Sequence, residues 1–253
     1  YIWERVFSVD SMIDLIAKFI TITEEKEEKN GKSYITKKII FPRYHQFNEV
    51  SKIVRDVKEK GLQGQNYLIM DSPGSGKTYS IAWLAHHLAS LHNEKNENIF
   101  DTVIVVTDRL VVDNQLQKAV LLVPHEEGSV SVMDDKCNST DLSKAINSGT
   151  KIIVSSIQLF SFILQKVKPL SDKKFAIIID ECHSSTKGAY MANATKALSQ
   201  EEAKKEDLKA DTEDDQDQIN DIIEADINRS GKRNNITFFG YSATPKKKTL
   251  ELF

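Results

Sequence analysis

YLIMDSPGSGKTY, residues 67–79, joins a short apolar run to a turn rich in glycine and then to the start of a helical pattern. The apolar run predicts a buried strand. The glycines allow backbone conformations in which successive N–H groups curl around an anion. A helix that starts near Lys77 directs its unpaired N–H groups and the positive end of its dipole at the same place. The stretch therefore predicts a phosphate-binding loop.

The side chains of this loop have expected roles toward a nucleotide. Lys77 is expected to reach the β- and γ-phosphates, and the Thr78 hydroxyl to bind Mg²⁺. Asp71 stands where the motif usually has glycine or alanine, and the strand end can direct its carboxylate away from the phosphates. The alternative is a tight strand-to-helix turn with a surface lysine. The remaining expected ATP contacts within the loop are Pro73, Gly74, Ser75 and Gly76.

Composition describes an ordinary globular protein. A chain of 253 residues, 28% of them charged, can form one large α/β domain or two small ones. The net charge of −3 means that any contact with nucleic acid must come from a local surface. Two cysteines are too few for a disulfide framework and fit a reducing, cytoplasmic setting. No apolar run approaches the roughly 18 residues of a membrane span, and no signal-peptide pattern opens the chain.

Further apolar runs rich in β-branched residues predict strands after the loop. Hydrophobic strands that alternate with amphipathic helices indicate a mostly parallel sheet with helices on both faces. In such sheets ligands bind at the carboxyl ends of the strands, where the polar motifs of this sequence lie. The predicted strands are residues 102–107, 129–133, 151–156, 174–180 and 236–244, and the predicted helices between them are 80–92, 109–122 and 157–167.

Residues 1–41 are expected to form a short amphipathic helix and a charged connector. TEEKEEKNGKS, residues 23–33, is predicted to be an exposed loop. A longer helix is predicted after Pro42, with Gly61 just past its end. The first helix is predicted from Met12, Ile13, Ile16 and Phe19, and the second from Phe47, Val50, Ile53, Val54 and Val57, which recur at helical spacing.

Two features fall outside this pattern. His86, His87 and His92 could suggest a metal site, but adjacent helical histidines point to different faces, and no cysteine or carboxylate cluster joins them. Residues 200–235 are dense in acidic residues and sparse in apolar ones, which predicts a surface insertion. A charged arm that docks a partner is the alternative for this segment.

Two carboxylates follow the most strand-like run of the chain, residues 174–180. Asp180 can hold Mg²⁺ through its water shell, and Glu181 can orient and deprotonate the water that attacks ATP. Near the start of the helix after Pro42, Gln46 carries the donor and acceptor that the adenine edge requires. Taken without its neighbours, Gln46 would be interpreted as a surface residue.

The order and spacing of GSGKT, DECH and SATP resemble the first RecA-like motor domain of superfamily 2 helicases and translocases. The longer phrases FPRYHQ, NYLIMDSPGSGKTYSIAWLAHHL, VIVVTDRLVVDNQL, DECHSS and FFGYSATPKKKTLELF resemble the motor (R) subunit of type I restriction enzymes, from about Trp3 onward. The resemblance implies a RecA-like P-loop NTPase fold over residues 42–253, with the acidic insertion on its surface. It also implies ATP and Mg²⁺ as cofactors.

The resemblance assigns a role to each residue that matches a family motif. Gln46 matches the adenine-reading glutamine, with Arg43 or Tyr44 as a neighbour that stacks on the base. Strand-end serines and threonines are matched to DNA contacts, although such residues serve as often as helix caps. The matched sets are Gly74, Gly76, Lys77 and Thr78 for the triphosphate; Asp180 and Glu181 for metal and catalysis; His183, Ser242 and Thr244 for coupling; and Thr107, Arg109, Ser155 and Gln158 for DNA.

The resemblance further implies an ATP-dependent translocase on double-stranded DNA that works with modification and specificity subunits in a prokaryotic cytoplasm. The nuclease domain and the second RecA-like lobe of that family are not recognisable here, so we expect a piece of a longer protein. Such a piece should turn ATP over poorly, because an arginine finger contributes about 10³ to 10⁵ in rate. The alternatives are the motor lobe of another superfamily 2 helicase or remodeller, and a nucleotide-gated binding module without productive hydrolysis.

Overall fold

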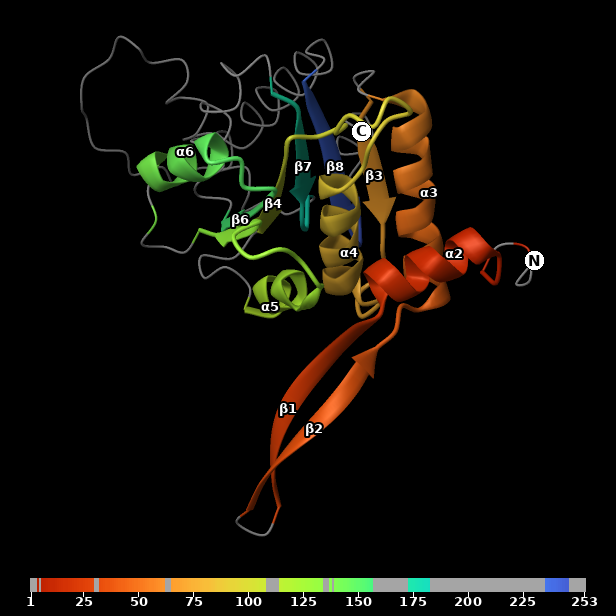
Figure 1. Ribbon diagram of the computed structural model, residues 1–253, viewed down its shortest axis with the longest axis vertical. Coiled ribbons are helices and arrows are strands. Elements are labelled where there is room, and N and C mark those ends of the chain that lie inside the picture. Colours follow the sequence, from red (N-terminus) through yellow and green to blue (C-terminus); the bar gives the residue numbers. More distant parts are fainter. Residues whose placement is uncertain are drawn as a thin grey trace.

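The computed structural model describes residues 4, 6–29, 32–61, 65–107, 114–133, 137, 139–156, 173–182 and 235–245. These residues form a layered α/β domain from which a long hairpin projects (Figure 1). The predicted helix at 157–167 lies outside the described residues, as does the acidic segment 200–235 apart from Asn235. In the part of the chain that is described, no helix has both the length and the apolarity that a membrane crossing requires.

A six-stranded sheet forms the centre of the domain, with the strand order β3-β8-β7-β4-β6-β5 and every pair parallel. Strands β4, β6, β7 and β8 are buried at every position, which explains their continuous runs of Val, Ile and Phe. The predicted mostly parallel sheet is confirmed. Its strands are β3 (Tyr67–Met70), β4 (Thr102–Thr107), β5 (Val130–Val132), β6 (Ile152–Ser156), β7 (Phe175–Ile179) and β8 (Ile236–Ser242).

Helices cover both faces of this sheet and divide its core in two. Val103 and Val105 of β4 pack in the core that includes α3 (Tyr44–Lys60), α4 (Lys77–Ala89) and α5 (Asn114–Leu122). Ile104 and Val106, the alternate residues, pack in the core that includes α6 (Ser139–Asn147). Alternate side chains of a strand point to opposite faces, so one strand contributes to both cores. Helix α6 is an element that the sequence analysis missed.

The N-terminal helix forms as predicted, but only two of the four apolar residues that predicted it pack on the core. It consists of α2 (Val9–Asp14) followed by a π-helical turn, η1 (Leu15–Phe19). Leu15 and Phe19 are buried against the core, whereas Ile13 and Ile16 are each 61% exposed. The π-helical turn closes an i→i+5 hydrogen bond from Ile20 N–H to the Leu15 carbonyl. Of the other two residues whose spacing predicted the helix, Phe19 is buried and Met12 packs against the core.

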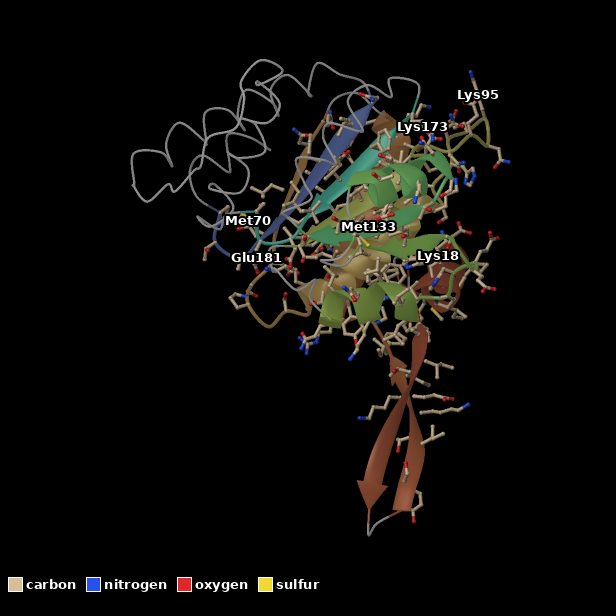
Figure 2. The ribbon with its side chains drawn as sticks, turned by 90° about the vertical axis from the view of Figure 1, so that its left-hand side faces the viewer. Lys18, Met70, Lys95, Met133, Lys173 and Glu181 are labelled. Carbon is tan, nitrogen blue, oxygen red and sulfur yellow. The ribbon has the colours of Figure 1, made fainter. Side chains whose placement is uncertain are left out.

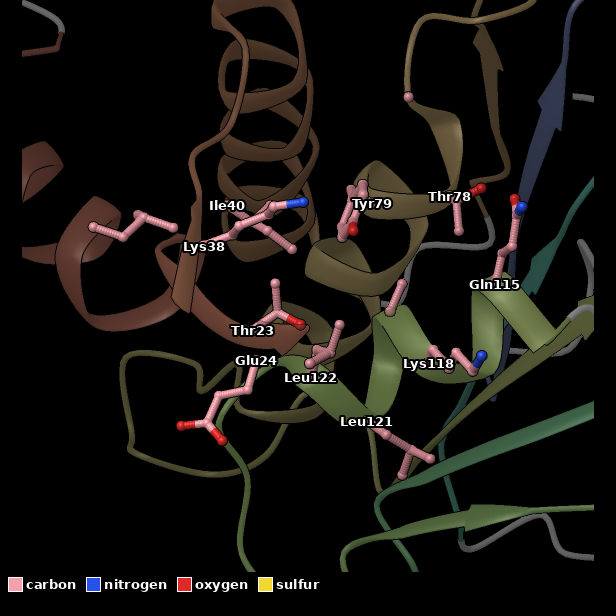
Figure 3. Close-up of a pocket in the computed structure, with 13 residues that line it drawn as sticks. Thr23, Glu24, Lys38, Ile40, Thr78, Tyr79, Gln115, Lys118, Leu121 and Leu122 are labelled. Carbon is pink, nitrogen blue, oxygen red and sulfur yellow. The ribbon is translucent and has the colours of Figure 1, made fainter. Parts of the chain in front are cut away.

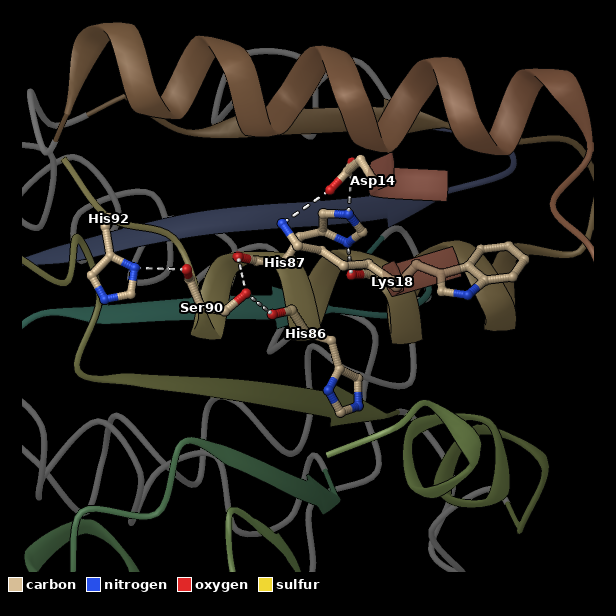
Figure 4. A network of polar contacts seen from close by, with 7 residues as sticks. Asp14, Lys18, His86, His87, Ser90 and His92 are labelled. Carbon is tan, nitrogen blue, oxygen red and sulfur yellow. Dashed lines mark hydrogen bonds and ion pairs between the residues drawn. The ribbon is translucent and has the colours of Figure 1, made fainter. Parts of the chain in front are cut away.

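A polar network fixes this N-terminal segment on α4 (Figure 4). The His87 Nε2 lies 3.3 Å from an Asp14 carboxylate oxygen, and Lys18 Nζ lies 3.0 Å from the other. Burial alone would raise the pKa of Asp14, but the hydrogen bonds and charges of His87 and Lys18 lower it to about 2. The His87 ring also lies beside Phe19, with 4.6 Å between the ring centroids. The segment is therefore held by both charge and packing.

The predicted exposed loop at 23–33 is wrong. Residues 23–29 belong to β1 (Thr21–Lys29), and residues 32 and 33 belong to β2 (Lys32–Ile40). The two strands form an antiparallel hairpin that extends away from the domain (Figure 1). Opposite charges pair across it, as in the ion pair of 3.3 Å between Glu24 and Lys37. A ribbon with solvent on both faces can be polar on both, so high charge density did not exclude strands here.

Candidate functional site

The polar motifs meet at one edge of the sheet. In Figure 2, Met70, at the end of β3, and Glu181, just after β7, lie at one side of the domain, while Lys95 and Lys173, which precede β4 and β7, lie at the opposite side. Strand β8 lies between β3 and β7. Carboxyl ends of parallel strands share an edge, so this edge is the expected ligand-binding edge.

The phosphate-binding loop has the backbone that its glycines predicted. Gly74 and Gly76 adopt left-handed φ angles of 78° and 92°. Gly76 is also the N-cap residue of α4, so the helix begins at Lys77. The first N–H groups of α4 therefore face the loop, as an anion-binding helix terminus requires.

Lys77 and Glu181 are in direct contact, although 104 residues separate them in the sequence. The Nζ of Lys77 donates to Oε1 of Glu181; the lysine side chain is 12% exposed and the glutamate 37%. Glu181 has a positive φ of 52°, a conformation that is uncommon for non-glycine residues. Asp180, the preceding residue, donates its backbone N–H to the Val106 carbonyl. The two motifs thus form one site.

Strand β8 joins the loop to the carboxylates through its backbone. The Asp71 N–H donates to the Ser242 carbonyl at 3.0 Å, and the Cys182 N–H donates to the Tyr241 carbonyl at 2.9 Å. Ser242 is fully buried, and Thr244 is exposed just beyond the strand. A shift of β8 would therefore move both the phosphate loop and the segment that carries Asp180 and Glu181.

Helix α3 holds the other side of the loop. Gln46 Oε1 accepts from the Arg43 N–H at 2.8 Å, and its Nε2 donates to the Gly76 carbonyl at 2.9 Å. His45 Nε2 lies 3.0 Å from the Ser75 carbonyl. Gln46 is only 4% exposed, so in this structure its amide positions the loop. The sequence analysis missed this role, for which the signal was a glutamine at the third position of the helix. Its role toward adenine stays a prediction.

A cavity of about 980 Å³ adjoins the end of the phosphate loop (Figure 3). Gly76, Thr78 and Tyr79 form its wall on the side of α4, and the base of the hairpin and α5 form the others. Its volume is in the range of small-molecule sites. The other residues that line it are Thr23, Glu24, Lys38, Ile39, Ile40, Gln115, Lys118, Ala119, Leu121 and Leu122.

The residues predicted to contact DNA lie on β4 and β6 or outside the described part of the chain. Thr107 and Ser155 lie in these adjacent strands and are 1% and 0% exposed. Their contact with DNA stays a prediction. Arg109, Gln158 and His183 lie outside the described residues.

The three histidines of the predicted helix after the loop point to different partners. His86 contacts the Val120 carbonyl, His87 the Trp83 carbonyl, and His92 the Ser90 carbonyl. Burial lowers the pKa of His86 to about 4, although the Val120 carbonyl raises it in part. Within the described ranges, no three His, Cys, Asp or Glu side chains gather as a metal-binding group.

Comparison with known proteins supports the fold and shows the family. The ATP-dependent Type ISP restriction-modification enzyme LlaBIII bound to DNA aligns with a TM-score of 0.52 and 16% identity over 86% of this chain and 13% of that chain. The Pyrococcus furiosus Hef helicase domain aligns with a TM-score of 0.49 and 17% identity over 83% of this chain and 35% of that chain. The chain thus spans at most about a third of the length of these two structures. No curated protein matches the sequence.

The family model described as SWI2/SNF2 ATPase matches residues 45–203, more than half of the chain. The matched range includes the start of α3, the whole phosphate loop and both carboxylates after β7. The match therefore includes Gln46, Lys77 and Glu181 of the site built above but not β8, and this protein belongs to the SWI2/SNF2 ATPase family.

Proposed function

We propose that this chain is the ATP-binding motor lobe of an ATP-dependent translocase on double-stranded DNA, in the R subunit of a type I restriction enzyme. The observation that carries the proposal is the contact between Lys77 and Glu181 at the carboxyl edge of the sheet. It brings a phosphate-binding cation and a candidate base together within a family of ATPases. The sequence stretches that resemble R subunits support the assignment to a type I restriction enzyme.

The donor set fits a nucleotide triphosphate with Mg²⁺. A Cβ atom at Gly76 would stand 2.5 Å from Gln46 Nε2, so the backbone is closely supported where it would face phosphate. Thr78 and Asp180 are the residues that would hold Mg²⁺, which when bound offsets phosphate charge. Lys77 binds the β- and γ-phosphates in this proposal. Glu181 orients the attacking water and accepts its proton at a carboxylate oxygen.

Coupling to DNA belongs to the same proposal. His183, Ser242 and Thr244 would pass the state of the nucleotide to the DNA-holding surface. Residues Thr107, Arg109, Ser155 and Gln158 would contact the DNA backbone. The partners would be the modification and specificity subunits, with a nuclease domain and a second RecA-like lobe in the same parent chain, in a prokaryotic cytoplasm.

The family match itself favours a second candidate, a SWI2/SNF2-type DNA motor outside any restriction complex. It differs from the first candidate in its partners and shares its ATP chemistry. Co-purification of the full-length protein with modification and specificity subunits would support the first candidate. Remodelling or strand displacement without these subunits would support the second.

Two substitutions in the full-length protein test the ATPase chemistry. Lys77→Ala should abolish ATP binding, and Glu181→Gln should keep ATP binding and lose DNA-stimulated hydrolysis. Lys95→Ala is the matched control, since Lys95 is an exposed lysine at the opposite side of the domain. Hydrolysis at wild-type rate in the Glu181 variant would contradict the proposed base. A nucleotide-gated binding module is indicated if DNA binding is lost in Lys77→Ala and unchanged in Glu181→Gln.

A further inference from the structure

The cavity beside the phosphate loop lies where a ligand bound to the loop would continue. One of its walls is formed by Gly76, Thr78 and Tyr79, so the cavity begins where the expected triphosphate contacts end. The base of the hairpin and α5 form the other walls (Figure 3). Its volume of about 980 Å³ is that of a site for a whole small molecule. A nucleotide whose phosphates lie on the loop has room for its nucleoside here.

The lining of the cavity combines apolar surface with positive charge. Its charged side chains are those of two lysines and one glutamate, Glu24, and this glutamate forms an ion pair of 3.3 Å with Lys37. Such a lining favours a ligand that is apolar in one part and anionic in another. A nucleoside triphosphate has this composition. The aliphatic residues of the lining come from the hairpin and α5 and are Ile39, Ile40, Ala119, Leu121 and Leu122.

The Gln46 amide, on the α3 side of the loop, is already in use. Its Oε1 accepts from the Arg43 N–H at 2.8 Å, and its Nε2 donates to the Gly76 carbonyl at 2.9 Å. The side chain is only 4% exposed. A base could use this amide only by displacing both hydrogen bonds. The cavity offers the base a place that requires no such displacement.

The hairpin joins the domain at the same cavity. At its base, Thr21 is buried and its hydroxyl donates to the Phe19 carbonyl at 3.4 Å, while Ile40 packs against the core. Farther out, Ile35 is 62% exposed, and the ribbon extends away from the domain (Figure 1). A ligand in the cavity would touch residues 38–40 and so add to the contacts that hold the hairpin in place.

We propose that the cavity binds the nucleoside half of the nucleotide, with the base of the hairpin as one wall, so that a bound nucleotide fixes the hairpin on the domain. The inference rests on the proposed ATP binding and adds the hairpin and α5 to the nucleotide site. The phosphates stay with Lys77 and the loop, and the base and sugar lie against the aliphatic side chains of β2 and α5. Burial of this apolar surface strengthens the binding of ATP but not of tripolyphosphate, which has no nucleoside.

Titration calorimetry of ATP and of tripolyphosphate, each with Mg²⁺, into the full-length protein separates the two halves of the site. The double variant Ile39→Ala with Leu121→Ala removes apolar lining from two walls. Both side chains are well exposed, at 69% and 47%, so the fold should be retained. The double variant should bind ATP roughly tenfold more weakly and tripolyphosphate as the wild type does. Ile35→Ala, on the same strand but outside the cavity lining, is the matched control and should leave both affinities unchanged.

A loss of affinity confined to ATP in the double variant supports the proposal. Unchanged ATP binding in this variant, or equal weakening of ATP and tripolyphosphate, overturns the nucleoside site and leaves the proposed ATP binding intact. A wild type that binds neither ligand overturns the proposed function as well.

Hydrogen exchange in the wild type provides a second measurement that needs no substitution. ATP should slow amide exchange at the base of the hairpin, residues 36–40, by at least roughly threefold, because the nucleoside adds contacts there. Tripolyphosphate should leave this exchange unchanged, since it does not reach the hairpin. The same exchange rates with ATP as with tripolyphosphate would overturn the proposal.

Discussion

The two glycines of the phosphate loop provide a matched pair for measuring how tightly α3 supports it. Both have left-handed φ angles, 78° at Gly74 and 92° at Gly76. A Cβ atom at Gly74 would meet nothing within 4 Å, whereas one at Gly76 would stand 2.5 Å from Nε2 of Gln46. Substitution by alanine therefore has the same backbone cost at both positions, but only at Gly76 does the new Cβ atom clash with Gln46.

The magnitudes follow from these contacts. A left-handed alanine costs about 1–2 kcal/mol, so Gly74→Ala should destabilise the chain by about that much. At Gly76 the Gln46 amide must also move and give up its bonds to the Gly76 carbonyl and the Arg43 N–H. Each such bond contributes about 1 kcal/mol, so Gly76→Ala should cost about 3–4 kcal/mol.

Urea unfolding without nucleotide measures this difference, because contacts with phosphate then contribute nothing. The reduced entropy of the unfolded chain that alanine brings is common to both variants and cancels in the comparison. Adding Gln46→Ala to Gly76→Ala should cost about 2 kcal/mol less than the sum of the single changes, since the clash is gone. Equal costs at the two glycines, or additivity in the double variant, would refute the support of the loop by Gln46.

Three further predictions test other parts of the structure, and urea unfolding measures each of them. Asp14→Asn should destabilise the chain near neutral pH; because the pKa of Asp14 is lowered from 3.8 to about 2, the loss should shrink as pH falls through this range. Tyr67→Phe should cost about 1 kcal/mol, the contribution of the 2.9 Å hydrogen bond to Asp56. Ile104→Ala should cost about 2–5 kcal/mol because Ile104 is fully buried, and Ile22→Ala, at 61% exposure, about 0.5 kcal/mol or less.

The central sheet could be predicted because four of its strands, β4, β6, β7 and β8, are buried at every position. Continuous apolar runs such as FAIII in β7 and TVIVVT in β4 are typical of strands with both faces covered, so they can be recognised from the sequence alone. The carboxyl-edge rule then brought Lys77 and Glu181 together without coordinates, and the structure places them in contact.

The features that could not be predicted depend on geometry that composition and periodicity do not determine. The hairpin of β1 and β2 exposes charged side chains together with apolar ones such as Ile22, Ile35 and Ile39, so its sequence lacks the regular alternation of a half-buried strand. The buried face of η1 depends on a π-helical hydrogen bond that periodicity does not encode. The use of both amide atoms of Gln46 requires the position of Gly76, thirty residues away.

The ion pair of Lys77 and Glu181 has a consequence for the order of events at the site. If Lys77 binds the terminal phosphate as proposed, an entering triphosphate competes with Glu181 for one positive charge, although the ammonium group has three N–H donors. The attraction between Lys77 and Glu181 would then weaken as the triphosphate enters. The proposed base would thus become more available to the attacking water in the same step that brings in the molecule to be cleaved.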